Sequence, residues 1–198
     1  MQPNQPFQPG MPYPPPQRAG GFPVWGIVLM ILGGLIFVVG IMAVLAISGV
    51  RQYLANAKMV EATSSLSTIA KSAVVAYDGA TAPEQALCSS ASSPVPTSVT
   101  MVSGKKYMST SSDWSVDEAK VGGFACLGFE MTSPQYYQYD YQRTGSAKGN
   151  VARDGFHAIA HGDLNGDGVV STFDYSGLID PSGKVILAPS IAQTNPTE

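Results

Sequence analysis

The feature that most constrains this chain is an uncharged, apolar run over residues 22–50. A helix of about 20 apolar residues crosses the hydrocarbon core of a bilayer, and this run is longer than that. A secretory signal has a shorter apolar region that follows Lys or Arg residues and precedes a small-residue cleavage site, and neither flank is present. Trp25 lies where an interfacial aromatic residue is expected. The run therefore predicts a transmembrane helix over residues 22–50 that is retained in the protein.

Three further parts flank this run. Residues 1–21 are mainly Pro, Gln, Gly, Met and Tyr, a composition that buries too little apolar area to fold, so we expect a disordered Pro/Gln-rich cytoplasmic tail. Residues 51–79 are expected to continue the helix as an amphipathic segment that ends near Gly79. Residues 80–198 are left for one β-rich head outside the cytoplasm. The apolar stripe of the amphipathic segment consists of Leu66, Ile69, Ala70, Ala73, Val74 and Tyr77.

Several segments of the head have strand-like patterns. Tyr137, Tyr139 and Tyr141 alternate with polar residues, which favours packing of the tyrosines against a core over a role in recognition. Residues 123–131 form a short apolar run that also indicates a strand. Three more strand segments, separated by Gly, Asn and Asp turns, are expected at residues 156–161, 169–173 and 184–187. The patterns predict an α+β fold with an antiparallel sheet of about four strands over the amphipathic helix.

The two cysteines, Cys88 and Cys126, both follow the apolar run and are too few for a thiolate metal site. One disulfide in an oxidising compartment is the expected use, and it would join the loop at Cys88 to the strand expected at Cys126. This places the head outside the cytoplasm. The positive-inside rule leans the other way, because Arg51 and Lys58 lie just after the run whereas Arg18 is the only basic residue before it.

Residues 163–174 read Asp-Leu-Asn-Gly-Asp-Gly-Val-Val-Ser-Thr-Phe-Asp, which matches the spacing of a twelve-residue calcium loop. Calcium requires six to eight hard oxygen ligands, and this spacing would supply them from one short segment. The flanking sequence is β-branched and aromatic, so a hairpin loop without an ion is the alternative interpretation. The predicted calcium ligands are Asp163, Asn165, Asp167, the carbonyl of Val169, Ser171 and Asp174.

The residues give little support for a transition-metal site, for enzymatic activity or for nucleic-acid binding. His157 and His161 would share a face and lie near Asp163, yet a third nitrogen or sulfur ligand for a transition metal is not apparent. The chain contains no nucleophile elbow or phosphate loop, and we expect no enzymatic activity. The formal net charge is −3, and all 14 acidic residues follow the apolar run, so the head offers no basic stripe for nucleic acid.

Residues 40–62 read Gly-Ile-Met-Ala-Val-Leu-Ala-Ile-Ser-Gly-Val-Arg-Gln-Tyr-Leu-Ala-Asn-Ala-Lys-Met-Val-Glu-Ala, and they resemble the N-terminal helix of type IV pilins and pseudopilins. In that family, a Gly-Ile-Leu-Ala-Ala-Ile-Ala-Ile-Pro stretch leads into a Tyr or Phe and then a Glu-Ala. The resemblance covers residues 40–69 and extends to the head by overall plan alone. An alignment without gaps places the prepilin cleavage glycine at Gly26, the next residue at Ile27 and the family's acidic position at Ile31.

This resemblance implies a pilin-like fold, in which one long N-terminal helix, transmembrane and then amphipathic, packs on the antiparallel sheet. It implies a non-enzymatic structural subunit of a type IV pilus or a type II secretion pseudopilus. Such a subunit is a single-pass inner-membrane protein with a cytoplasmic N-terminus and a periplasmic or extracellular head. Its partners are the membrane and other pilin-like subunits, which it contacts through the helix. The alternative is a free-standing, membrane-anchored binding module that calcium stabilises and that does not form a filament.

Overall fold

The structure is a computed structural model that describes residues 23–80, 86–145 and 154–198. The tail predicted over residues 1–21 lies outside the described residues. The chain divides into two compact units, Met1–Ile47 and Ser48–Glu198. A single helix, α1 (Val24–Gly79), contributes residues to both units, and it ends at the residue predicted from the sequence.

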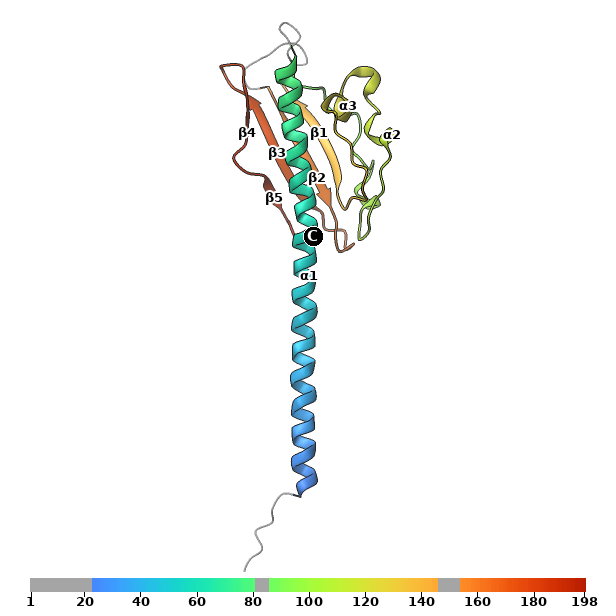
Figure 1. Cartoon of the computed structure of the whole chain (residues 1–198), viewed down its shortest axis with the longest axis vertical. Coiled ribbons are helices and arrows are strands. Elements are labelled where there is room, and N and C mark those ends of the chain that lie inside the picture. The colour runs from blue at the N-terminus through green and yellow to red at the C-terminus, as the bar shows by residue number, and fades with distance from the viewer. Residues whose placement is uncertain (1–22, 81–85, 146–153) are drawn as a thin grey trace, which may run out of the picture. The chain divides into compact units, whose positions relative to one another are not determined.

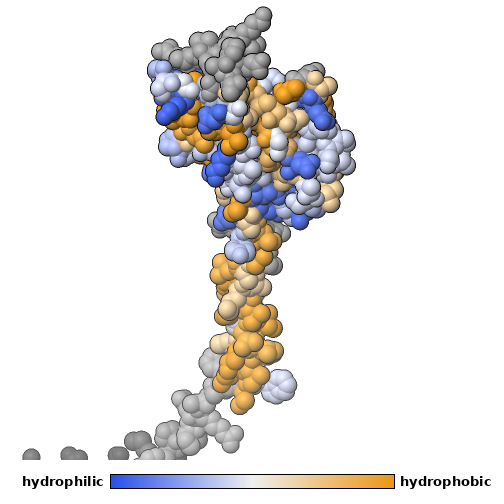
Figure 2. All heavy atoms as spheres, turned by 45° about the horizontal axis from the view of Figure 1, so that its top comes forward, coloured by the Kyte–Doolittle hydropathy of each residue, from blue (hydrophilic) through white to orange (hydrophobic). Residues whose placement is uncertain are grey.

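The described part of the first unit is the apolar part of α1. The segment Val24–Ala46 has a mean hydropathy of 3.0, and none of its most apolar window is buried within the protein. Figure 2 shows it as apolar over the face in view. This segment confirms that the chain carries an N-terminal helix long and apolar enough to cross a membrane.

The second unit contains a five-stranded antiparallel sheet (Figure 1). Its first three strands form a meander in the order β1, β2 and β3. The two short strands that follow, β4 and β5, pair one after the other with the same edge of β3. The strands are β1 (Gln138–Thr144), β2 (Gly155–Gly162), β3 (Ser171–Ile179), β4 (Val185–Leu187) and β5 (Ala192–Thr194). The sheet and α1 together confirm the predicted α+β class.

Within this unit the second half of α1 lies across one face of the sheet (Figure 1). Its predicted apolar stripe is buried, apart from Val74, which is half-buried. On the facing strands, side chains alternate between core and solvent, and the three tyrosines of the alternating pattern have no exposed surface. Ala160 on β2 pairs with Tyr139 on β1 and with Phe173 on β3. Because the alanine side chain is small, it leaves space between the two rings for the helix that packs above β2.

The segment between α1 and β1 packs on the edge of the sheet through a buried aromatic cluster. Trp114 lies 5.0 Å from Phe124 and 5.3 Å from Phe129 between ring centroids, and 6.4 Å from Tyr139 on β1. Val95 exchanges two backbone hydrogen bonds with Tyr139, which covers the free edge of β1. The short helices of this segment are η1 (Val99–Met101), α2 (Ser111–Trp114), η2 (Glu118–Lys120) and α3 (Gly123–Leu127).

The strand predicted over residues 123–131 is wrong, because Cys126 lies in the helix α3. Gly123 and Gly128 have φ values of 53° and 59°, and these left-handed residues bracket the single turn. Phe124 and Leu127 are both buried at a spacing of three, which suits a helix. An apolar run this short does not distinguish a strand from a buried turn of helix by its pattern.

Both ends of β3 also differ from the sequence prediction. β3 begins at Ser171, because the backbone N–H of Val169 donates to the Asp167 carboxylate at 2.8 Å and stays in the preceding loop. β3 then continues to Ile179, six residues past the predicted end at Phe173. β5 is absent from the prediction, since its three residues are all exposed and carry no alternating pattern.

Candidate functional sites

The most extensive candidate surface is the apolar part of α1. Its 23 residues, Val24–Ala46, contain no charged side chain, and the helix satisfies their backbone hydrogen bonds internally. At about 1.5 Å per residue, this length exceeds the roughly 30 Å of a hydrocarbon core. Side chains such as Leu35 and Phe37 are 61% and 69% exposed. The segment can therefore cross a bilayer.

Glu61 is the first carboxylate in the chain, and it joins α1 to the start of β1. Its Oε1 accepts a hydrogen bond from the backbone N–H of Tyr136 at 2.8 Å and one from the Tyr139 hydroxyl at 3.2 Å. Burial raises the pKa of Glu61, and these hydrogen bonds oppose the rise. A polar contact thus fixes the position of α1 along the sheet.

Two lysines lie close to the same junction. The Nζ atoms of Lys58 and Lys106 are 4.5 Å and 4.9 Å from the centroid of the Tyr136 ring. Lysines at these distances interact favourably with the face of an aromatic ring. Lys106 also lowers the pKa of Glu61 through its charge, although burial outweighs this effect. The group is a compact, mixed-charge contact between α1, the segment before α2 and the residues before β1.

The predicted calcium loop forms the hairpin between β2 and β3. Asp163 is buried, and it accepts hydrogen bonds from the Ser103 hydroxyl at 2.6 Å, from Gly166 N–H at 2.8 Å and from Gly168 N–H at 3.2 Å. The Ser103 hydrogen bond is the main reason that the pKa of Asp163 is lowered. Asn165 is exposed and accepts a hydrogen bond from Asp167 N–H at 2.9 Å. These contacts organise the loop around the Asp163 carboxylate.

The structure brings Asp163, Asn165 and Asp167 into this loop and leaves the other predicted side-chain ligands outside it. Ser171 is fully buried, and its hydroxyl donates to the Gly162 carbonyl at 3.0 Å. Asp174 is three residues further along β3, so it lies on the opposite face of the sheet. Val169 lies in the loop, where its backbone N–H donates to the Asp167 carboxylate at 2.8 Å. Among the residues that the structure describes, no three His, Cys, Asp or Glu side chains are placed to hold a metal ion.

The two histidines lie on the face of β2 that points away from α1. The residues that alternate with them along the strand, such as Phe156 and Ala158, are buried on the opposite face. Nδ1 of His157 lies 2.9 Å from both carboxylate oxygens of Asp174. Nδ1 of His161 lies 3.0 Å from the Thr172 hydroxyl, and burial lowers the pKa of His161. The histidines therefore have separate partners on β3 and do not share Asp163.

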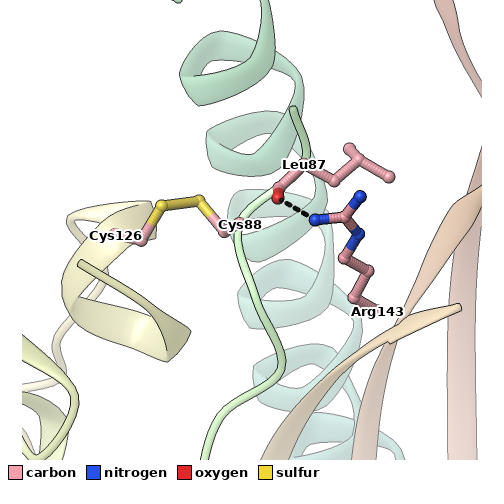
Figure 3. The surroundings of a disulfide bond; sticks show 4 residues. All are labelled: Leu87, Cys88, Cys126 and Arg143. Atoms are coloured by element: carbon pink, nitrogen blue, oxygen red, sulfur yellow. Dashed lines mark hydrogen bonds between the residues drawn. A yellow bond between two sulfur atoms is a disulfide. The ribbon is translucent and has the colours of Figure 1, made fainter. Parts of the chain in front are cut away.

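The disulfide joins Cys88 to Cys126, 38 residues apart in the chain, as predicted (Figure 3). It links the segment after α1 to α3. Beside it, Nη1 of Arg143 on β1 donates to the carbonyl of Leu87 at 3.1 Å. Arg143 also forms an ion pair with Asp154 at 3.7 Å, at the start of β2. The disulfide and Arg143 together hold the chain that follows α1 against the sheet.

Sequence reasoning missed several of these contacts. Glu61 could have been found, because it lies eight residues before Ile69 and so on the edge of the buried face of α1. Ser103 and Glu198, whose side chains contact Asp163 and Asn165, are far from the loop in sequence. No local pattern indicates contacts of that kind.

Comparison with models of known protein families, with curated proteins and with solved structures found no match for this chain.

Proposed function

We propose that this chain is a non-enzymatic, single-pass membrane protein that acts as a pilin-like structural subunit of a type IV pilus or a type II secretion pseudopilus. The observation that carries this proposal is the difference in exposure between the two parts of α1. Its first part exposes an uninterrupted apolar surface, and its second part supplies the core stripe of the head. A helix of this kind can anchor the protein in a membrane and also form part of the core of the head.

The exposed apolar surface supports the anchor. Burying apolar area is worth about 25 cal/mol per Å², so leaving this segment in water would be strongly unfavourable. A bilayer or a bundle of identical helices would cover it. The glycines at 33, 34 and 40 would permit close helix contacts, because they leave open space beside the helix.

The disulfide supports the orientation. A disulfide between Cys88 and Cys126 forms and persists in an oxidising compartment, and both cysteines lie in the head. In the proposed arrangement, the N-terminus is cytoplasmic, α1 crosses the inner membrane and the head lies in the periplasm or outside the cell.

Packing roles of the buried polar side chains support a structural function. The buried Gln135 side chain donates to the carbonyls of Val95 and Tyr137 at 3.0 Å and 2.8 Å and accepts from the Ser109 hydroxyl at 3.0 Å. Glu61 and Asp163 have equally specific partners that join separate segments. Each of these polar groups contributes to the assembly of the head.

One observation favours a second candidate, a free-standing membrane-anchored binding module. The chain carries Ile31 where the pilin family has an acidic residue, and no Asp or Glu precedes Glu61. A subunit without that charge lacks the group that pairs with a neighbouring amino terminus during assembly in the family. In this second proposal the loop at Asp163, Asn165 and Asp167 binds calcium and stabilises the head.

The test of the first proposal is the intact mass and amino-terminal sequence of the protein purified from its native membrane. A mature terminus at Ile27 or Phe22 is expected for a filament subunit processed by a prepilin peptidase. A chain that still begins at Met1 would contradict this proposal and favour the anchored module. A Gly26→Ala variant is the matched control for a terminus at Ile27, because it should block cleavage at that site while leaving the helix intact.

The second proposal has its own test, a calcium titration of the melting temperature of the full chain in detergent. The module proposal expects the melting temperature to rise with calcium and to fall with chelator. Asp167→Asn should remove the response, whereas Asp174→Asn should preserve it, since Asp174 lies on the other face of the sheet. An unchanged melting temperature in the original protein would reject calcium stabilisation.

A further inference from the structure

The loop between β2 and β3 contains a chemically labile dipeptide. Of the five asparagines in the chain, only Asn165 precedes a glycine. Asn165 and Gly166 are both exposed, and Gly166 has a φ of 77°, in the left-handed region. Glycine has no side chain to hinder approach of its backbone nitrogen to the preceding side chain. Asparagine followed by glycine is therefore the pair best suited to intramolecular deamidation.

The reaction needs no external catalyst. The backbone nitrogen of Gly166 loses its proton and attacks Cγ of Asn165, which forms a new C–N bond and closes a five-membered succinimide. The bond from Cγ to Nδ2 breaks, and Nδ2 leaves as ammonia after taking up a proton. Water then opens the ring at either carbonyl, which yields aspartate or isoaspartate. The net change is the gain of one water and the loss of one ammonia.

In this protein the attacking nitrogen is occupied. Gly166 N–H donates to Oδ1 of Asp163 at 2.8 Å. Asp163 is buried, and its other oxygen is held by the Ser103 hydroxyl at 2.6 Å and by Gly168 N–H at 3.2 Å. A carboxylate fixed by these two further donors holds the Gly166 nitrogen in place. Its negative charge also opposes formation of an amide anion beside it.

The reacting amide is restrained as well. Oδ1 of Asn165 accepts from Asp167 N–H at 2.9 Å. Nδ2 donates to the carboxylates of Asp167 at 3.0 Å and of Glu198 at 2.6 Å. Rotation of the Asn165 side chain toward the Gly166 nitrogen would break these hydrogen bonds. The native loop thus restrains both partners of the reaction.

We propose that Asn165 is a deamidation site whose rate is set by Asp163, which protects the Gly166 nitrogen in the folded protein. Ser103 takes part by fixing the protecting carboxylate. This inference is independent of the proposed function, because it concerns the chemistry of the loop in either a filament subunit or an anchored module.

The test is deamidation of the full chain in detergent at mildly alkaline pH, followed over time by peptide mapping with mass spectrometry. Asp163→Asn should accelerate deamidation at Asn165 by about tenfold or more, the effect of losing one charge-assisted hydrogen bond. Ser103→Ala should give a smaller acceleration. Asn165→Gln should abolish the product and so identify its origin. The wild-type chain in urea provides the unprotected rate.

Glu198→Gln is the matched control, because its amide oxygen can still accept from Nδ2 of Asn165 and the change removes only a nearby negative charge that does not contact the Gly166 nitrogen. Its rate should stay near that of the wild type. Amide exchange of β2 and β3 shows whether each variant keeps the hairpin folded. A folded Asp163→Asn variant that deamidates no faster than the wild type would overturn the proposal. A wild-type rate equal to the rate in urea would also overturn it.

Discussion

At the scale of single residues, Glu61 is the clearest case of a polar group that is retained within an apolar contact. It sits on the edge of the buried stripe of α1, half-buried, with the N–H of Tyr136 and the hydroxyl of Tyr139 as its donors. Desolvation of the carboxylate is unfavourable, and the hydrogen bonds offset part of that cost. The position requires an acceptor and does not require a charge.

We therefore expect Glu61→Gln to retain the stability of the head at neutral pH and Glu61→Ala to lower it. The glutamine keeps a carbonyl oxygen for both donors, whereas alanine leaves a backbone N–H and a hydroxyl unpaired, at a cost of about 1 to 3 kcal/mol. Urea unfolding of the full chain in detergent, followed by tryptophan fluorescence, measures both variants. A glutamine variant as unstable as the alanine variant would show that the charge itself is needed.

The same residue gives a pH dependence whose sign follows from its pKa. Burial raises the pKa of Glu61 above its ordinary value of 4.5, so folding favours the protonated form. The stabilisation from this proton is complete below 4.5 and is lost as the pH rises through the folded-state pKa. The unfolding free energy of the wild type relative to Glu61→Gln should therefore fall as the pH rises from below 4.5 through the folded-state pKa of Glu61. A shift of opposite sign would contradict burial as the dominant effect.

At the scale of elements, the segment between α1 and β1 depends on a few long-range ties. The disulfide joins its beginning to α3, and Arg143 holds the carbonyl of Leu87 beside the bridge (Figure 3). We expect a double Cys88→Ser, Cys126→Ser variant to lose about 2 to 4 kcal/mol, since the bridge closes a loop across 38 residues of the chain. Urea unfolding with and without reductant measures this loss. Equal stability of the oxidised and reduced wild-type chains would contradict it.

The contact between α1 and the sheet depends on small residues on β2. Ala160 has no exposed surface and lies between Tyr139 and Phe173. Ala160→Leu should destabilise the head by about 1 to 3 kcal/mol, because the added volume forces the rings or the helix to move. Ile159→Leu on the outer face of the same strand is the control and should change stability little. A neutral Ala160→Leu variant would show that the helix does not pack closely over β2.

The elements differ in how far the sequence predicts them. The stripe of α1 and the alternating tyrosines repeat a periodic pattern over several turns or residue pairs, and the uncharged run is continuous over more than 20 residues. The helix and β1 follow these signals. The turn at α3 depends on two left-handed glycines and on burial against Trp114, which no local pattern contains. The contacts of Ser103 and Glu198 with the hairpin loop depend on the complete fold. The calcium ligands were predicted from spacing alone, and strand geometry separates Ser171 from Asp174.

At the scale of the whole molecule, one helix serves two environments. The same element has an exposed apolar surface in the described part of the first unit and a buried stripe in the second. The stability of the head therefore includes contacts made by residues of α1, such as Leu66 and Tyr77. A head cut away from α1 would lose that stripe and expose the inner face of the sheet. The head therefore needs the second half of α1 to complete its core.

Membrane topology decides on which side of the membrane the head lies. We expect the head to face away from the cytoplasm, since the disulfide requires an oxidising compartment, although Arg51 and Lys58 follow the span. Protease added to spheroplasts should degrade the head, while an epitope placed before residue 22 should stay protected until detergent is added. Leu35→Arg, at the centre of Val24–Ala46, is the control for insertion, because a central Arg costs about 2.5 to 3.5 kcal/mol. A protected head with an accessible N-terminal epitope would reverse the topology, and with it the environment in which Cys88 and Cys126 must pair.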